Sequence, residues 1–171
     1  MGVLWDPYLR KMIKMPHAMY WDTMHCKWAS GGVVQYMLNT FALELGRRGI
    51  TLAELDAFTN QCKGHCLKRK TFWSKRIVKK AAAHIRAFAS ETMDAMYVLK
   101  LVCDARGIAT WPSMQQHARA LELMHAVARI TGRPRDILIN LGAWEAFVAV
   151  YQELHQRLCV TKPKCHLGWH V

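Results

Sequence analysis

The chain has 171 residues, of which 52% are hydrophobic and 21% are charged. This composition is that of one folded domain, and it excludes a globally disordered chain, a collagen-like protein and a small disulfide scaffold. The 24 Lys and Arg outnumber the 12 Asp and Glu, so the net charge is +12 and a polyanion such as nucleic acid is the expected class of partner.

Hydropathy and cysteine usage set the expected compartment. The longest stretch without a charge, residues 28–43, is too short and too polar to cross a bilayer. Asp6 interrupts the N-terminal segment where a secretory signal has an apolar run. We therefore expect an intracellular protein without a membrane partner, in which the six cysteines are thiols or ligands and not disulfides.

The first half of the chain begins with a segment that lacks a sustained period. Pro7 and Pro16 predict an irregular or extended entry over residues 1–32. Apolar residues then recur at helical spacing over residues 33–47, which predicts the first long helix. Thr51 and Glu54 have the spacing of a capping box, so a second helix is expected from residue 52 to about residue 62.

Three further helices are predicted in the second half. One begins at Ser74 and is stopped by Gly107, and the next runs from Pro112 to the glycine at position 132. The last covers residues 134–158 and is followed by an extended tail over residues 161–171. The apolar face of the helix from Ser74 is formed by Ile85, Phe88, Ala89, Met96, Leu99 and Cys103.

These elements predict a mainly α fold, an irregular assembly of about five helices with short extended segments at both ends. The helical domain is expected to span residues 33–160.

One block of the sequence carries most of the excess charge. Between Ala57 and Ser90 there are nine Lys and Arg and no Asp or Glu, and these cations surround Phe72 and Trp73. Cations that neutralise phosphates beside rings that stack on bases are typical of nucleic-acid surfaces. The alternative is a solvated helix face with both rings turned into the core. The predicted nucleic-acid-binding residues are Lys63, Lys68, Arg69, Lys70, Trp73, Lys75, Arg76, Lys79, Lys80 and Arg86.

Two groups of residues have the chemistry of a metal site. Cys62, His65 and Cys66 resemble a zinc knuckle, for which a second ligand pair would come from the tail. This spacing fits no standard finger, and small buried thiols are common, so we do not expect zinc. The residues of the tail that have ligand chemistry are Cys165, His166 and His170.

Asp22 and His25 form the other group, because a carboxylate at the end of an extended segment can hold a divalent cation. The simpler interpretation is that Asp22 caps the helix that follows. His25 also precedes Cys26, a pair that has the residue types of a thiol nucleophile and its base but no visible orienting group.

The segment from Tyr20 to His25, followed by residues 29–32 and an apolar helix, resembles DDE transposases of the CACTA (EnSpm) type. Those enzymes of mobile elements have an RNase H-like core. The resemblance implies that Asp22 corresponds to the second metal-binding carboxylate, with Mg²⁺ as the cofactor of an intact parent enzyme. It also implies that the helices over residues 51–158 are the family's large insertion, and that residues 162–166 with His170 lead back toward the core.

The chain departs from that family in its acids. Only Asp22 can be carried over as a metal ligand, since Glu91 and Glu145 lie on helices of the presumed insertion. A pair of metal ions needs several carboxylates, so we expect this chain alone to be a catalytically incomplete fragment or decayed copy.

The expected function is non-specific binding to the backbone of duplex DNA, with a nuclear location. The Met- and Trp-rich apolar residues Met12, Met15, Trp21 and Trp169 also suggest association with itself or with a longer homologous chain. A hypothesis from another class is a helical scaffold or interaction module whose basic face meets an acidic protein.

Overall fold

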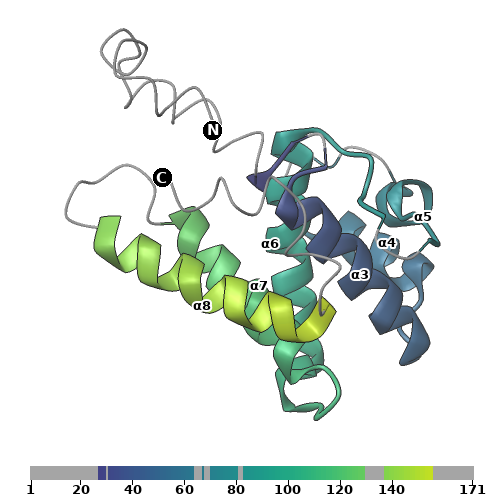
Figure 1. The fold of residues 1–171 in the computed structure, drawn as a ribbon. Coiled ribbons are helices and arrows are strands. Elements are labelled where there is room, and N and C mark those ends of the chain that lie inside the picture. The colour runs from purple at the N-terminus through teal and green to yellow at the C-terminus, as the bar shows by residue number, and fades with distance from the viewer. Residues whose placement is uncertain are drawn as a thin grey trace, which may run out of the picture.

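The computed structural model describes residues 27–29, 31–63, 67, 70–80, 83–129 and 137–155. Six α-helices and a short 3-10 helix are found there, and none of these ranges contains a strand (Figure 1). The predicted mainly α fold is therefore confirmed. The division into residues 1–32, 33–160 and 161–171 stays a prediction, because most of both terminal parts lies outside the described residues. The elements are α3 (Val33–Arg47), α4 (Leu52–Gln61), α5 (Phe72–Arg76), α6 (Ala89–Arg106), η2 (Ile108–Thr110), α7 (Gln115–Arg129) and α8 (Ile137–His155).

Helix α3 has the predicted bounds, and two glycines allow the chain to enter it. Gly31 has a φ of 79°, a backbone conformation that side chains with a Cβ rarely adopt. A Cβ added at Gly32 would lie 2.6 Å from the carbonyl oxygen of Lys27, so only glycine fits this close approach. The chain turns here so that Trp28 is buried against the same core as α3.

The capping box that begins α4 is confirmed. The hydroxyl of Thr51 accepts a hydrogen bond from the Glu54 N–H at 3.2 Å, and the Glu54 carboxylate accepts one from the Thr51 N–H at 2.7 Å. These two bonds satisfy amide groups that would otherwise have no partner at the helix start. Helix α4 ends at Gln61, one residue before the predicted end.

The long helix predicted from Ser74 to Gly107 is wrong in its first half. Helix α5 ends at Arg76, and α6 begins at Ala89. The described residues between them, 77–80 and 83–88, are not helical, and we call them the connecting segment. The C-terminal end is as predicted, since Gly107 has a φ of 59° and stops α6.

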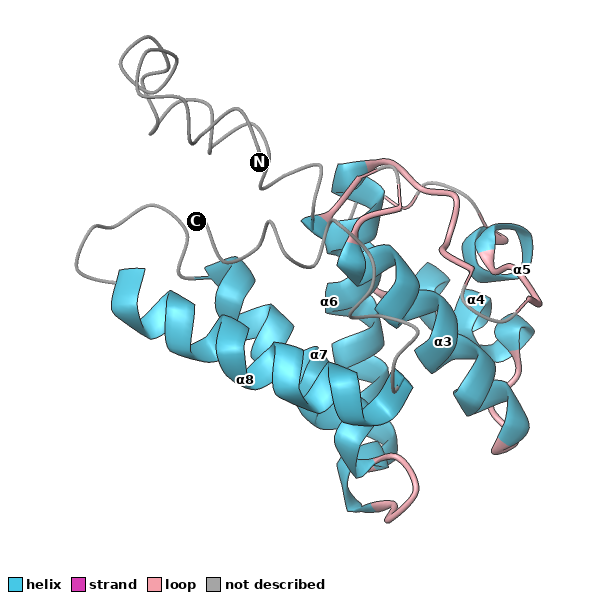
Figure 2. Cartoon of the chain, in the orientation of Figure 1, coloured by secondary structure: helices cyan, strands magenta, loops and turns pink. Residues whose placement is uncertain are grey.

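The core lies where α6 contacts α3, α4 and α7 (Figure 2), and α7 in turn packs along α8. The apolar stripe predicted on α3 is buried, including Met37 and Phe41. Met114, just before α7, and Leu121 and Met124 on α7 are buried too. Other large side chains of the core include Phe72, Trp73, Leu99, Trp144, Phe147 and Tyr151. No helix in the described ranges is long and apolar enough to span a membrane.

Candidate nucleic-acid interface

A buried carboxylate positions α5 against α4. Asp56, on α4, is only 5% exposed. Its two oxygens accept hydrogen bonds from the N–H of Trp73 at 2.7 Å and the N–H of Ser74 at 3.1 Å, and from the Ser74 hydroxyl. Because a carboxylate satisfies the free amides at a helix start, Asp56 stabilises a helix of one and a half turns that would not form alone. Lys75 is thereby held on the outer side of α5.

The prediction that Trp73 binds nucleic acid is wrong. Its ring is fully buried, and its Nε1–H donates a hydrogen bond to the hydroxyl of Thr59 at 2.9 Å. Phe72 lies edge-on to it, with the ring centroids 5.3 Å apart. The alternative interpretation of this pair, as core residues, is the one the structure supports. The two large rings provide most of the apolar contact between this short helix and the core. Burying them is therefore more favourable than leaving them in water.

Two amide side chains of α3 hold the connecting segment. Asn39 donates to the carbonyl of Val78 at 3.0 Å and accepts from its N–H at 2.8 Å. One turn earlier, the side chain of Gln35 donates to the carbonyl of Ala87 at 2.7 Å, and the Gln35 backbone carbonyl accepts from the Ile85 N–H at 3.2 Å. The connecting segment is therefore fixed at both ends by α3.

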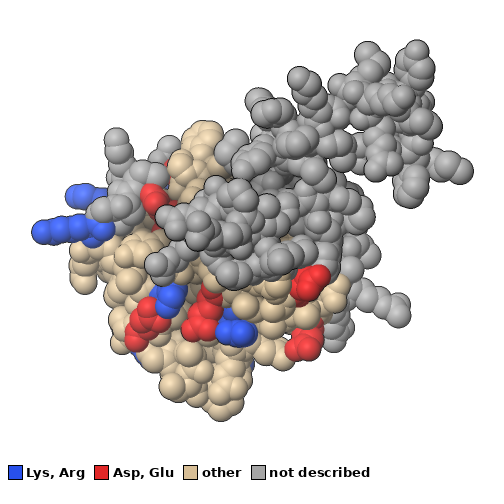
Figure 3. Space-filling model, turned by 90° about the vertical axis from the view of Figure 1, so that its left-hand side faces the viewer, with Lys and Arg blue, Asp and Glu red and all other residues tan. Residues whose placement is uncertain are grey.

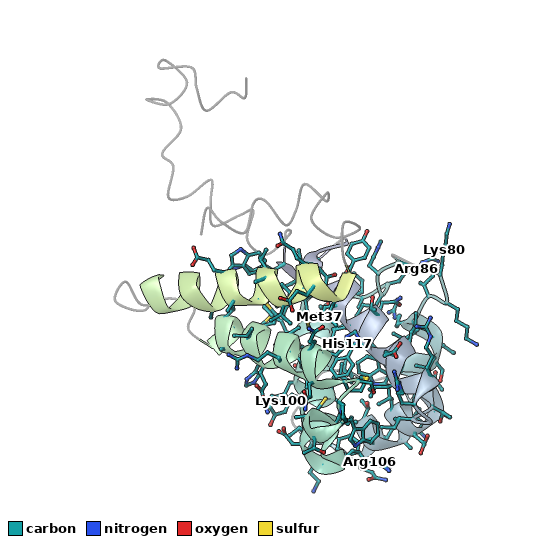
Figure 4. All side chains as sticks on the ribbon, turned by 60° about the horizontal axis from the view of Figure 1, so that its bottom comes forward. Met37, Lys80, Arg86, Lys100, Arg106 and His117 are labelled. Atoms are coloured by element: carbon teal, nitrogen blue, oxygen red, sulfur yellow. The ribbon has the colours of Figure 1, made fainter. Side chains whose placement is uncertain are left out.

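The cations of the basic block lie on the outside of this framework. Two contacts to backbone carbonyls fix the backbone that carries them: the Asn60 side chain donates to the carbonyl of Lys70 at 3.1 Å, and the Arg86 N–H donates to the carbonyl of Arg76 at 3.4 Å. In Figure 4, Lys80 and Arg86 project from the same corner of the molecule. We define the basic surface as the exposed residues Lys63, Lys70, Lys75, Lys79, Lys80 and Arg86.

The two acids nearest to the basic surface in the sequence, Asp56 and Glu91, both accept hydrogen bonds from groups within the fold. Asp56 is bound to α5 as described above. Glu91 accepts hydrogen bonds from the Phe88 N–H at 2.9 Å and from the guanidinium of Arg76 at 3.5 Å. Among the described residues, neither carboxylate forms a salt bridge with a lysine of the basic surface. Arg76, which the sequence placed among the binding residues, is partly buried and pairs with Glu91, so it is not among the exposed cations, and its role in binding stays a prediction.

Several charges elsewhere in the described ranges are paired with a neighbour three or four residues away. Arg47 and Arg48 both bind Glu44, and Lys100 binds Asp104. On the side opposite α5, which faces the viewer in Figure 3, acidic and basic side chains are interspersed across the described surface. The exposed positive charges are therefore concentrated at the corner formed by α4, α5 and the connecting segment.

The remaining predicted site residues fall largely outside the described residues. Cys62 is a free, partly buried thiol whose pKa is raised by burial. Within the described ranges, no three His, Cys, Asp or Glu side chains gather to hold a metal ion. Both the zinc interpretation and the Asp22 interpretation therefore stay predictions. The site residues outside the described ranges are Asp22, His25, Cys26, His65, Cys66, Lys68, Arg69, Cys165, His166 and His170.

One exposed residue, Phe88, was not predicted from the sequence. Phe88, expected on the buried face of a helix, is 74% exposed. The four residues before α6 alternate, with Ile85 buried, Arg86 exposed, Ala87 partly buried and Phe88 exposed. This alternation in burial is that of an extended segment, and the sequence does not show it, because the exposed Phe88 is itself apolar.

None of the protein-family models, curated proteins or solved structures compared with the chain matches it.

Proposed function

We propose that the chain binds the phosphate backbone of nucleic acid, and duplex DNA in particular, through the basic surface. The observation that supports this most directly is the electrostatic balance of that corner. Six cationic side chains are exposed there, while the carboxylates of Asp56 and Glu91 are held by hydrogen bonds within the fold. A surface of one sign attracts phosphates over distances of about 8 Å at physiological salt.

The chemistry of these cations favours contacts to the phosphate backbone over recognition of base edges. Five of the six are lysines, whose ammonium groups act as mobile point charges. Bidentate contacts to base edges depend mostly on the planar groups of Arg, Asn and Gln. We therefore propose binding that depends strongly on salt and only weakly on DNA sequence.

A salt titration of DNA binding tests the proposal. Anisotropy of a labelled 20-base-pair duplex would be followed between 50 and 200 mM NaCl, where several phosphate contacts together change affinity by about 100-fold or more. The variant Lys75→Glu with Lys79→Glu should weaken binding to all duplex sequences alike. Both side chains are exposed, so the helical circular dichroism should be unchanged.

A matched pair of substitutions controls for net charge. Arg106→Glu with Arg119→Glu changes the net charge by the same amount at two exposed positions outside the basic surface. Arg106 lies at the opposite end of the molecule from Lys80 and Arg86 (Figure 4). Equal loss of affinity in both double variants would contradict the assigned surface. Salt-sensitive binding to an acidic protein, without binding to DNA, would favour the scaffold hypothesis.

The resemblance to DDE transposases supports the choice of DNA, and we propose descent from such an enzyme. Asp22 is the single acid of this chain that the resemblance assigns to a metal ion. One carboxylate does not hold two metal ions, so no strand cleavage is expected with Mg²⁺. Nicking of a supercoiled plasmid that requires Mg²⁺ and is abolished in Asp22→Ala would overturn the view that the chain is catalytically incomplete.

A further inference from the structure

Phe88 is a large apolar side chain that the fold holds in solvent. It is 74% exposed, more than Tyr97 or Met93, the other exposed large apolar residues in the described ranges. Its backbone is fixed, because its N–H donates to Glu91 and its carbonyl accepts from the Thr92 N–H and hydroxyl, both at 2.8 Å. The ring is therefore presented at the start of α6 from a well-anchored position.

The connecting segment places this ring beside the basic surface. Residues 85 and 87 are bonded to Gln35 on the inner side. In an extended chain, alternate side chains project to the same side, about 7 Å apart. Arg86 and Phe88 therefore project outward together, and Arg86 belongs to the same corner as Lys80 (Figure 4). The aromatic ring of Phe88 therefore lies next to the Arg86 guanidinium, on the same side of the molecule as the lysines of the basic surface.

We propose that Phe88 stacks on an unpaired base, so that the basic surface accepts single-stranded nucleic acid. This inference depends on the proposed backbone binding and adds the class of strand. The lysines neutralise successive phosphates, while the ring covers the face of one base and is itself removed from water. In a duplex, both faces of each base are already stacked, so Phe88 contributes only when the strand is open.

Three probes of equal length separate stacking from charge. They are a single-stranded oligothymidylate, a single strand of abasic nucleotides and a duplex, each measured by competition at fixed salt. The protein should prefer oligothymidylate over the abasic strand, and Phe88→Ala should weaken oligothymidylate binding by about fivefold or more. The same substitution should change affinity for the abasic strand and for the duplex by less than about twofold.

Two further variants show whether the aromatic ring itself is needed. Phe88→Tyr should keep the preference for oligothymidylate, whereas Phe88→Leu, which is apolar but has no ring, should lose it. Tyr97→Ala is the matched control, because Tyr97 is also exposed but lies nine residues along α6 and stacks on His125. It should bind all three probes as the unmodified chain does.

The outcomes distinguish the inference from the proposed function. Steep salt dependence with all probes, and no selective effect of Phe88→Ala, would overturn the stacking role and leave backbone binding in place. Full binding by Phe88→Leu would also overturn it. Failure to bind any of the three probes would overturn both.

Discussion

Asn39 and Val78, which are 39 residues apart in the sequence, form two reciprocal hydrogen bonds. The Asn39 amide nitrogen lies 3.0 Å from the Val78 carbonyl oxygen, and the Val78 N–H lies 2.8 Å from the Asn39 side-chain oxygen. A side-chain amide here satisfies both backbone polar groups of one residue, as a neighbouring strand would. The pair holds the segment that carries Lys79 and Lys80 against α3.

Loss of this pair should destabilise the protein. Asn39→Leu leaves the partly buried N–H of Val78 without its partner, while the Val78 carbonyl keeps the bond from the Lys80 N–H, so the free energy of unfolding should fall by about 2 kcal/mol. Urea denaturation measures the fall, and hydrogen exchange at the Val78 amide should become faster. Thr40→Ala is the control, because the Thr40 hydroxyl bonds only to the carbonyl of Tyr36 within α3, and its loss should have a smaller effect. Unchanged stability in Asn39→Leu would contradict a structural role for the pair.

Asp56 should have a larger effect on stability than a surface acid. Asp56→Ala removes the acceptor for two buried or partly buried N–H groups at the start of α5, so unfolding should require about 3 kcal/mol less free energy. In Asp104→Ala, an exposed acid that pairs with Lys100 on the same helix is lost, and the change should stay below about 0.5 kcal/mol. Chemical denaturation of both variants gives the comparison. Equal effects would mean that α5 does not depend on Asp56.

His117 should make the stability depend on pH. Burial lowers the pKa of His117, which stacks on Phe41 in the core, although the charge of Glu44 acts in the opposite direction. As the pH falls below about 6.5, the unfolded chain takes up a proton that the folded chain resists. The contribution of this residue is complete above that pH and is lost as the pH falls through the folded pKa.

The test is the urea midpoint between pH 7 and pH 5. It should decline more steeply with falling pH in the unmodified chain than in His117→Phe, a variant that retains an aromatic ring but does not titrate. Parallel curves for the two proteins would show that His117 is not responsible.

Cys103 should not react in the folded protein. Burial raises the pKa of its thiol to about 12, so almost none of the reactive thiolate is present at pH 8. Iodoacetamide at that pH should leave Cys103 unmodified in native protein and modify it in urea, as shown by peptide mass mapping. Rapid modification without denaturant would mean that α6 opens locally much more often than its buried position implies.

Local signals in the sequence were sufficient for much of the fold. The apolar stripe of α3, the Thr51 and Glu54 capping box and the stop at Gly107 each depend on residues within a few positions of one another. Such interactions form inside one helix, and their spacing is therefore visible in the sequence. Composition alone likewise located the block of cations between residues 57 and 90.

Tertiary structure decided which residues of that block face solvent. The side chains of Gln35 and Asn39 bond to backbone groups of the connecting segment, and these contacts between distant residues replace the helical hydrogen bonds that the local pattern suggested. Once the segment is extended, the helical period no longer assigns its faces. Phe88 is consequently exposed beside Arg86, although the helical pattern placed it on the buried face. Trp73, on α5, is buried against α4, where Asp56 and Thr59 accept its hydrogen bonds. A hydrogen bond that spans 39 residues leaves no periodic trace in the sequence, so only the packed structure could assign these two rings.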